Sequence, residues 1–541
     1  MMKSFEKPEI EDTADKIWNF RPIFFVAVFL CFGIVFSYHH LFSGVSVWWA
    51  LLILPAIGAL TLLCGISNHI KKWAITASAL LLAFLFGACL FHARAEQYLQ
   101  KTLIGGEYAA VGVVERKAEY DFALALTLSD VTIGENEQQG KLVAYLPISF
   151  AEKVRLADKV LLEGVVIQES EFSAYAADEN IRFTAHAESM VVVGRSSDLF
   201  LLFRERLESV IYENTEETAA ALIVAVLTGN TDGISNGLLN NMRYGGIAHI
   251  FAVSGLHVSA LYGFCLLLTE KTKMRKLPKL AKFFLTAVLL LAYGGVCGFS
   301  ASIIRATVIC LLLSAAKFIG IASDMTENAG AAAIVVLLRS PFALFTVGFQ
   351  LSFAAFLGIV WLTRPIANGC NFLLGKAFPK TKQSAVEERP PSARERSIRA
   401  VVSFFSVSLA AQIFTAPILL SAFEYLSLWG LLLNCIFVPA VSACFSFLLA
   451  LAMIACLLPF LANILLYLPA LLWTLLTFLF EIVDFSKFCI RGVKFEGGAF
   501  MLYYFAFSFL TDKWNVKSFW KKLFFVVVFV LFGVGMYALN A

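Results

Sequence analysis

The sequence predicts a polytopic α-helical membrane protein that carries one small extracytoplasmic all-β insert with an OB-like fold. Two observations lead to this prediction. Of the 541 residues, 59% are hydrophobic and only 15% are charged, whereas a soluble protein carries about a quarter charged residues. Apolar stretches of about 20 residues, the length that crosses a bilayer, recur along the chain, and one polar region with alternating apolar residues interrupts them.

The N-terminal region predicts a cytoplasmic tail followed by three membrane helices. Residues 1–21 form the tail, which includes the acidic run EKPEIEDTADK. The N-terminal transmembrane region covers 22–95, with apolar segments near 22–38, 46–66 and 73–92. The leader is acidic and no A-x-A-like cleavage site ends the first segment, so we expect a retained helix and not a signal peptide.

The insert at 104–195 predicts a small barrel of strands. Apolar and polar residues alternate there with the period of half-buried strands, at 108–115, 122–128, 141–147, 159–166 and 182–193. Five short strands in one small domain favour an OB-like barrel. The insert holds 15 acidic and 8 basic residues, a net charge of about −7, which leaves about +11 on the rest of the chain.

An acidic domain is a poor binder of the phosphate backbone. Contact between the insert and nucleic acid would therefore need aromatic stacking or a local basic face. The available aromatic residues are Phe122, Tyr145, Phe150 and Tyr175, although packing in the core is the more common use of aromatic side chains in a small barrel.

The membrane core follows in two parts, 198–365 and 400–541, separated by a charged, proline-containing linker at 376–399 that we expect to be disordered. The first part begins with a polar-striped helix near 198–212 and a short apolar helix at 216–228. The apolar segments of the core lie near 246–268, 283–299, 301–320, 328–338, 342–363, 399–424, 427–458, 460–484, 497–511 and 522–540. The segment at 328–338 is short for a span, and Pro439 leaves open whether 427–458 crosses once or twice.

Lysine and arginine orient these segments in a cytoplasmic (inner) membrane. Lys71 and Lys72, six basic residues in 271–282 and seven in 376–399 should all face the cytoplasm. The loop near 39–45 has no lysine or arginine and should face outward. These assignments place the N-terminus inside and the strand insert outside, and the chain end comes out extracytoplasmic.

The candidate site is formed by polar side chains within apolar segments, because such groups usually face a cavity or one another. The stretch HIFAVSGLHVSAL at 249–261 carries His249, Ser254, Gly255 and His257. On one continuous helix, Ser254 and His257 would share a face. They fit a nucleophile with its base, a hydrogen-bonded packing pair, or the lining of a polar path. The lack of a nearby acid and of a G-x-S-x-G turn disfavours hydrolysis.

Further polar residues occur at membrane depth in the second half of the chain. They are Arg305, Gln350, Ser352, Gln412 and Asn434. A buried arginine here needs a carboxylate, helix-end carbonyls or water, unless it snorkels to the interface. Pro417 and Pro439 beside the two amides fit broken helices that line a cavity. Glu481 and Asp484 we place at the membrane interface, without a function.

No cofactor or catalytic motif stands out. The 11 cysteines are scattered and form no CxxC pair, and the seven histidines form no HxH or HxxxH cluster. A Walker lysine loop and a GxGxxG loop are both absent. We therefore expect no metal, no nucleotide and no enzymatic activity, and we interpret the cysteines as small buried hydrophobes.

The stretch RYGGIAHIFAVSGLHVSAL at 243–261 resembles the ComEC family of competence proteins, the inner-membrane channels for incoming DNA. It has Gly246, two further residues, His249, and then the family's A-[IV]-S-G-L-H-V pattern at 252–258. Four more stretches resemble family elements in the same order: TGNTDGIS at 228–235, SASIIRA at 300–306, RSPFALFTVGFQLSFAA at 339–355 and TAPILLSAFEYLSLWGLLLNCIFVP at 415–439. Helices followed by a strand insert match the family's layout.

The resemblance implies uptake of single-stranded DNA during natural transformation, with the nine polar and glycine residues named above lining or bracing the path through the membrane lipid. Because the chain has no nucleotide motif, a cytoplasmic helicase or single-strand-binding protein would pull the strand. Many members of the family end in a metallo-β-lactamase-like domain with an HxHxDH motif, whereas this chain ends in YALNA. Either a separate nuclease delivers single strands, or this protein is not a working competence channel. The resemblance also allows a DNA receptor and a homo-oligomer.

Three other functions stay open. A secondary transporter of a small anionic solute would fit broken helices and a lone buried arginine equally well, although no inverted symmetry between halves is visible. An intramembrane hydrolase would use Ser254 and His257. A non-transporting envelope scaffold would need none of these polar residues.

Overall fold

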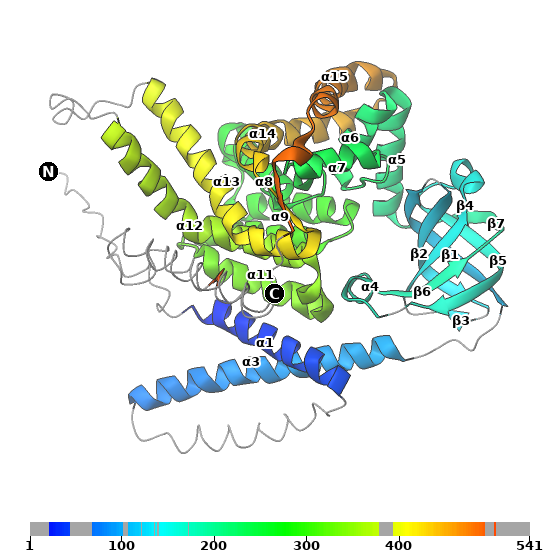
Figure 1. The fold of residues 1–541 in the computed structure, drawn as a ribbon, viewed down its shortest axis with the longest axis horizontal. Helices are drawn as coiled ribbons and strands as arrows, with labels where there is room; N and C mark the ends of the chain where they lie inside the picture. The colour runs from blue at the N-terminus through cyan, green and yellow to red at the C-terminus, as the bar shows by residue number, and fades with distance from the viewer. Residues whose placement is uncertain are drawn as a thin grey trace.

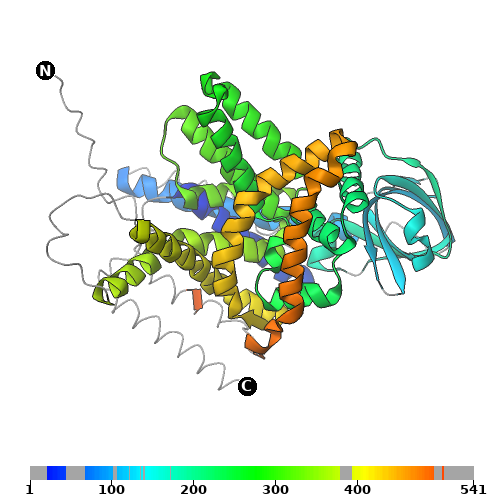
Figure 2. The same cartoon turned by 90° about the horizontal axis from the view of Figure 1, so that it is seen from above.

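The computed structural model describes residues 21–43, 68–100, 107–120, 122–134, 136–137, 140–170, 172–377, 393–492 and 503–504. Most of this chain is helical, and a strand domain lies at one end of the helical body (Figures 1 and 2). Eight helices of the described part are long and apolar enough to cross a membrane. This protein is therefore a multi-pass membrane protein.

The eight candidate spans agree with apolar segments predicted from the sequence. They are Pro22–His39 in α1 (Pro22–Ser43), Ile75–Leu99 in α3 (Asn68–Leu99), α9 (Lys279–Val296), α10 (Ala301–Ile319), Val347–Leu373 in α12 (Val347–Ala377), Arg396–Phe423 in α13 (Ala393–Phe423), α14 (Trp429–Leu457) and Pro459–Ile482 with α15 (Ala462–Ile482). The predicted helices at 46–66 and 522–540 lie outside the described residues, as does 497–511 apart from 503–504.

The prediction that prolines break the helices at 410–440 is wrong. α13 continues through Pro417 and α14 continues through Pro439, so 427–458 forms one helix. Proline at 417 removes the hydrogen bond to the carbonyl of Ile413. The hydroxyl of Tyr503 donates to that carbonyl at 2.8 Å, which explains how the helix tolerates the proline.

The charged linker is shorter than predicted. α12 continues to Ala377 and α13 begins at Ala393, so the expected disorder is wrong for both ends of 376–399. Alanine, arginine and glutamate at 393–396 are strong helix formers and extend the apolar helix into its charged flank. Residues 378–392 lie outside the described part.

The strand domain contains strands at four of the five predicted positions, whereas the fifth prediction, one strand at 182–193, is wrong because two strands lie there. The strands of the domain are β1 (Glu107–Glu119), β2 (Ala123–Ile133), β3 (Asn136–Glu137), β4 (Lys141–Pro147), β5 (Asp158–Glu169), β6 (Ile181–His186) and β7 (Met190–Arg195). The pairing order β1-β2-β4-β6-β5 is closed by a β1–β5 pair, and β4–β6 is the parallel pair. In β2, Leu124, Leu126 and Leu128 are fully buried and alternate with partly exposed residues, as a barrel core requires. We call this domain the strand barrel.

Three short helices connect the strand barrel to the candidate site. α5 (Leu199–Asn214) leads into α6 (Glu217–Thr228), in which every residue from Ala219 to Thr228 is buried, and α7 (Asn236–Tyr244) follows. A helix that is apolar on all sides belongs in a protein core. α6 accordingly lies within the main apolar cluster, among residues of α5, α14 and α15.

The apolar segment at 246–268 is not one helix. It contains η4 (Ala248–Ile250), an irregular stretch at 251–254, and then α8 (Gly255–Lys271). Gly246 has a positive φ of 76° and Ser254 has extended backbone, and both conformations are incompatible with a continuous helix. The segment at 328–338 is part of α11 (Met325–Arg339).

Candidate functional site

Ser254 and His257 form the start of α8. The Ser254 side chain accepts a hydrogen bond from the backbone N–H of Leu256 at 3.3 Å, and the Ser254 N–H donates to His257 Nδ1 at 3.1 Å. This reciprocal arrangement is a capping box, with histidine in the place that Glu or Gln commonly takes. The expectation that the two residues share a helix face is wrong, because Ser254 precedes the helix.

The geometry of this pair differs from that of an activated nucleophile. Ser254 Oγ lies 3.5 Å from His257 Nδ1, and that nitrogen already accepts the backbone N–H of Ser254. His257 is fully buried, and in the described part of the chain Nε2 has no hydrogen-bond partner. A nucleophile with its base needs a third group to orient the base, and among the described residues no carboxylate bonds to this histidine.

Arg305, a residue of α10, is the charged residue that lies against the start of α8. A Cβ built on Gly255 would lie 2.7 Å from a guanidinium nitrogen of Arg305, so a larger residue at 255 would displace the end of the Arg305 side chain. Arg305 Nε donates to Ser352 Oγ at 2.8 Å, and the guanidinium lies over the rings of Phe353 and Phe356 at 5.8 and 5.2 Å. The structure thus brings Gly255, Arg305 and Ser352 together.

The charge of Arg305 is unusual in its surroundings. The residue is 8% exposed, and within the described residues it forms no ion pair with a carboxylate. A snorkelling arginine extends its charged head to the interface, whereas this head is enclosed by α8, α10 and α12. Buried cations usually have a paired anion, so this guanidinium has the capacity to bind one.

Helix dipoles add positive potential at the same place. Gly255 is the first residue of α8, Arg305 is in the second turn of α10, and Ser352 is in the second turn of α12. The N-terminal end of a helix carries roughly half a positive charge and presents free N–H groups. This effect falls off within the first turn, so α8, whose first residue lies against Arg305, is the helix whose N-terminus favours an anionic ligand here.

Gln350 lies near this site but bonds elsewhere. Its Nε2 donates to the carbonyl of Leu344 at 3.1 Å, in η6 (Pro341–Phe345), the turn that precedes α12. The side chain therefore holds the entry into α12. No hydrogen bond of the described residues joins it to Arg305.

His249, Gln412 and Asn434 belong to a second group around the start of α14, of which Asn434 is a part. His249 Nδ1 contacts the carbonyl of Gly246 at 3.1 Å, and a Cβ on Gly246 would lie only 2.6 Å from the Cα of Gly430. The His249 side chain is exposed.

Gln412 and Asn434 lie on the two helices near the close approach of Gly246 and Gly430. Gln412 Nε2 donates to the carbonyl of Ser427, in the strand β8 (Tyr425–Ser427) that pairs with β9 (Cys489–Arg491).

Asn434 is four residues after Gly430 and eleven before Phe445, so all three residues share one face of α14. Its Oδ1 is buried without a partner among the described residues. Phe445 packs against the His257 ring at 4.7 Å, which connects the two groups.

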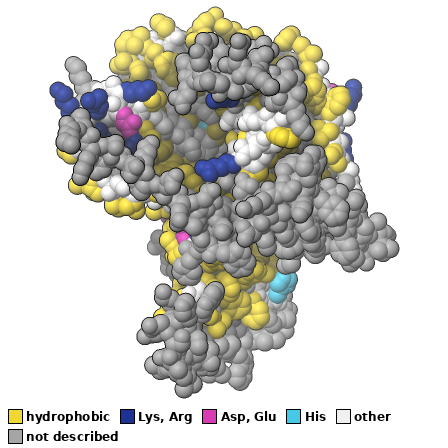
Figure 3. All heavy atoms as spheres, turned by 90° about the vertical axis from the view of Figure 1, so that its left-hand side faces the viewer, with side chains coloured by type: hydrophobic (Ala, Val, Ile, Leu, Met, Phe, Trp, Pro, Cys, Tyr) yellow, Lys and Arg dark blue, Asp and Glu magenta, His cyan; other side chains and the backbone are white. Residues whose placement is uncertain are grey.

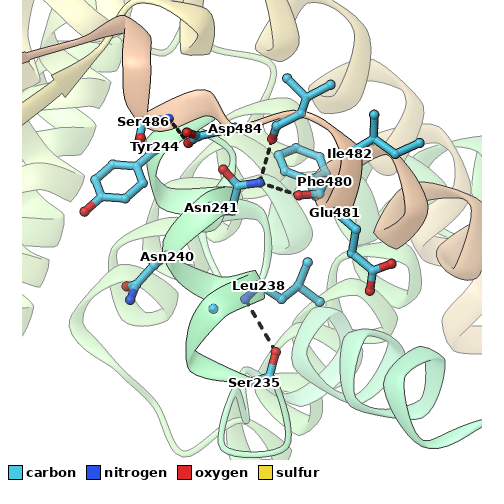
Figure 4. A pocket seen from close by; sticks show the side chains of 12 residues that line it. Ser235, Leu238, Asn240, Asn241, Tyr244, Phe480, Glu481, Ile482, Asp484 and Ser486 are labelled. Atoms are coloured by element: carbon cyan, nitrogen blue, oxygen red, sulfur yellow. Dashed lines mark hydrogen bonds between the residues drawn. The ribbon is translucent and has the colours of Figure 1, made fainter.

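A separate cavity lies between α7 and the end of α15 (Figure 4). Its volume is about 500 Å³, and Glu481 and Asp484 are among its lining residues. Hydrogen bonds from Ser486 hold the pKa of Asp484 below its usual range, so the carboxyl is ionised at neutral pH. Asn241 Nδ2 donates to the carbonyl of Val483 at 2.7 Å and caps α15. An acidic lining does not suit a phosphate.

One face of the molecule is hollowed. Seen from the side of α12 and α13, the surface has a recess with Lys and Arg side chains at its border (Figure 3). Basic residues around a concave surface concentrate anions near it. The positive charge at this recess has the same sign as the buried charge of Arg305.

Sequence reasoning missed a polar network before the site. Glu208 of α5 is 8% exposed and accepts hydrogen bonds from Arg204 at 2.9 Å, Thr228 at 3.0 Å and Asn230 at 3.2 Å. Asp232, in the same turn as Asn230, pairs with Arg116 of the strand barrel. The signal that could have found these residues is the polar turn TGNTDGIS at 228–235, directly after a fully apolar helix.

Comparison with known proteins agrees with these elements. A family model described as "Competence protein" matches residues 226–517, more than half of the chain. Searches of curated proteins and of solved structures gave no match. The matched region contains the start of α8, Arg305, Ser352, Gln412 and Asn434. The chain therefore belongs to the competence protein family.

Proposed function

We propose that this protein is a channel that conducts single-stranded DNA across the cytoplasmic membrane during natural transformation. The observation that carries the proposal is Arg305, a buried cation without a carboxylate partner among the described residues, placed at the N-terminus of α8. Single-stranded DNA carries one negative charge per nucleotide, so its path needs cations or amide donors. Membership of the competence family adds the expectation that the anion is DNA.

We propose further that the strand barrel is an OB-type domain outside the cell membrane. The closed pairing β1-β2-β4-β6-β5 with one parallel pair supports this fold. The extracytoplasmic placement follows from the positive charges at 271–282 and 376–399, which favour the cytoplasm. The N-terminus is then cytoplasmic.

The energy for uptake comes from a partner in this proposal. A cytoplasmic helicase or single-strand-binding protein pulls the strand, and a separate nuclease and a DNA receptor supply it from outside. The path acts by binding and not by chemistry, because the Ser254–His257 contact serves the start of a helix. Additional copies of the chain could surround one path.

The test is DNA uptake in a transformable host from which the native gene is deleted. Cells carrying the unaltered protein, Arg305→Ala or Lys317→Ala take up labelled DNA, with membrane levels matched by immunoblot. Lys317 is the matched control, since it is an exposed cation on the same helix that pairs with Glu270. Loss of a hydrogen bond to a charged group costs about 1.5–3 kcal/mol. We therefore expect Arg305→Ala to lower uptake by roughly tenfold or more and Lys317→Ala to leave it unchanged.

Other outcomes select other functions. If the unaltered protein restores no uptake where another family member does, the channel proposal is wrong. Transport of inorganic phosphate into proteoliposomes that depends on Arg305 would then identify a transporter of small anions. Equal behaviour of all polar variants in both assays would identify a scaffold.

A further inference from the structure

The turn at 228–235 lies between the strand barrel and the start of α8, and it contacts both. Arg116 of β1 binds Asp232 with two hydrogen bonds, Nε to Oδ2 at 3.1 Å and Nη2 to Oδ1 at 2.8 Å. Bidentate arginine–carboxylate pairs fix geometry as well as contribute energy. Hydrogen bonding to Asp232 raises the pKa of Arg116 above its usual value, so the pair is ionised at any pH at which the carboxylate is.

The turn itself is held firmly. Asn230 Oδ1 accepts the backbone N–H of Asp232 at 3.1 Å, while Asn230 Nδ2 donates to Glu208 at 3.2 Å. A Cβ on Gly233 would lie 2.2 Å from the hydroxyl oxygen of Tyr212. These contacts fix the conformation of the turn, so a displacement of the Asp232 carboxylate would displace the turn as a whole.

The other side of the turn packs on the residue before α8. Gly229 has a φ of 81°, and a Cβ there would lie 2.9 Å from Val253 Cγ2 and 3.3 Å from Val253 N. Val253 directly precedes Ser254, the N-cap of α8, and Gly255 contacts Arg305. A continuous series of contacts thus joins the barrel to the guanidinium at the proposed DNA path.

We propose that Arg116 and Asp232 are positioning residues, whose ion pair lets the strand barrel set the position of the α8 N-terminus relative to Arg305. Neither residue touches the transported strand at this site. The consequence for uptake rests on the proposed function, whereas the positioning of α8 does not. The barrel is then a part of the path's geometry and not only a domain attached to it.

Other contacts hold the barrel to the helical body without touching this turn, and they provide a matched control. Arg195 at the end of β7 pairs with Glu205 of α5 at 3.3 Å. If simple attachment of the barrel mattered, Arg195→Ala would have the same effect as Arg116→Ala. If the turn transmits position, the two variants differ.

The experiment is hydrogen exchange of the purified full-length protein in detergent, read by mass spectrometry in peptides that cover 249–257. The backbone N–H groups of Ser254 and Leu256 form the capping box, so their exchange reports the start of α8. Variants are Arg116→Ala, Asp232→Asn, the charge-reversed pair Arg116→Asp with Asp232→Arg, and Arg195→Ala. Asp232→Asn preserves shape and serves if a larger change prevents folding.

We expect the two single variants at the pair to speed exchange at 249–257 by roughly threefold, the size of a partly exposed ion pair's contribution. The charge-reversed pair should return the rate to that of the unaltered protein, and Arg195→Ala should not change it. Unchanged exchange in both single variants, or an equal change in Arg195→Ala, would overturn the proposal. Failure of charge reversal to restore the rate would do so as well.

DNA uptake by the same variants separates this proposal from the proposed function. If DNA is the cargo, uptake falls with Arg116→Ala and recovers in the charge-reversed pair. If the unaltered protein conducts no DNA, the channel proposal fails, while the exchange result still decides whether the barrel positions α8.

Discussion

Two polar sites of the helical body, at Glu208 and at Arg305, hold their charges in opposite ways. Glu208, at the junction of α5 and the turn at 228–235, is 8% exposed and accepts hydrogen bonds from Arg204, Thr228 and Asn230. Arg305 is equally buried but has Ser352 as its hydrogen-bond acceptor in the described chain. A buried charge with a full set of partners stabilises one structure, whereas one with open capacity suits a ligand.

The largest expected effect on stability comes from a substitution at Glu208, the buried charge with a full set of hydrogen-bond partners. Glu208→Ala should destabilise the protein by about 3 kcal/mol, because it leaves the partly buried Arg204 without its carboxylate and the buried Thr228 without its acceptor. The measurement is the temperature at which the purified protein loses its monodisperse state in detergent, together with its membrane level. Glu213→Ala on the same helix, at an exposed position, is the control and should change little. Equal stability of both variants would remove the contrast between the two sites.

A smaller effect is expected at the start of α8. Ser254→Ala should cost about 1 kcal/mol of stability, the usual value of an N-cap. Ser254→Asn should recover most of this loss, since asparagine is an equally good N-cap, and DNA uptake should follow stability in both variants. A hydrolase would instead lose activity in both, because asparagine cannot act as the nucleophile.

The smallest effect on stability is expected at Arg305. Arg305→Met removes a buried charge without leaving a carboxylate unpaired, so stability should change by less than about 1 kcal/mol or rise. DNA uptake should nevertheless fall. Thermal stability and uptake of the same preparation provide the measurement. A loss of stability comparable to that of Glu208→Ala would mean that Arg305 is a structural residue.

The sequence predicted the helices and strands well, because both signals are local. Apolar length identified α9 and α10, and alternation identified the strands of the barrel. A lone cation in an apolar segment predicts a polar neighbourhood for Arg305, and the structure places Ser352 and the rings of Phe353 and Phe356 around its guanidinium. That Arg305 contacts Gly255 and Ser352 could not be predicted from any local sequence pattern, because three different helices supply the three residues.

The roles of Ser254 and His257 could not be derived from spacing. A separation of three residues fits both a shared helix face and a capping box, and the break at 251–254 decides between them. The pair of Arg116 and Asp232 joins positions 116 residues apart. Such a contact depends on how the barrel docks, which periodicity does not encode.

The hydrogen bond from Tyr503 to the carbonyl of Ile413 has a consequence for how the chain is made. The two residues are 90 positions apart, and a ribosome needs about 5–20 s to add that many. During that time α13 has left the ribosome with Pro417 in place and the carbonyl of Ile413 without its final partner. The hydrogen bonding of this helix is therefore completed only after Tyr503 has been added, and a chain shortened before Tyr503 would lack the donor that this carbonyl has in the structure.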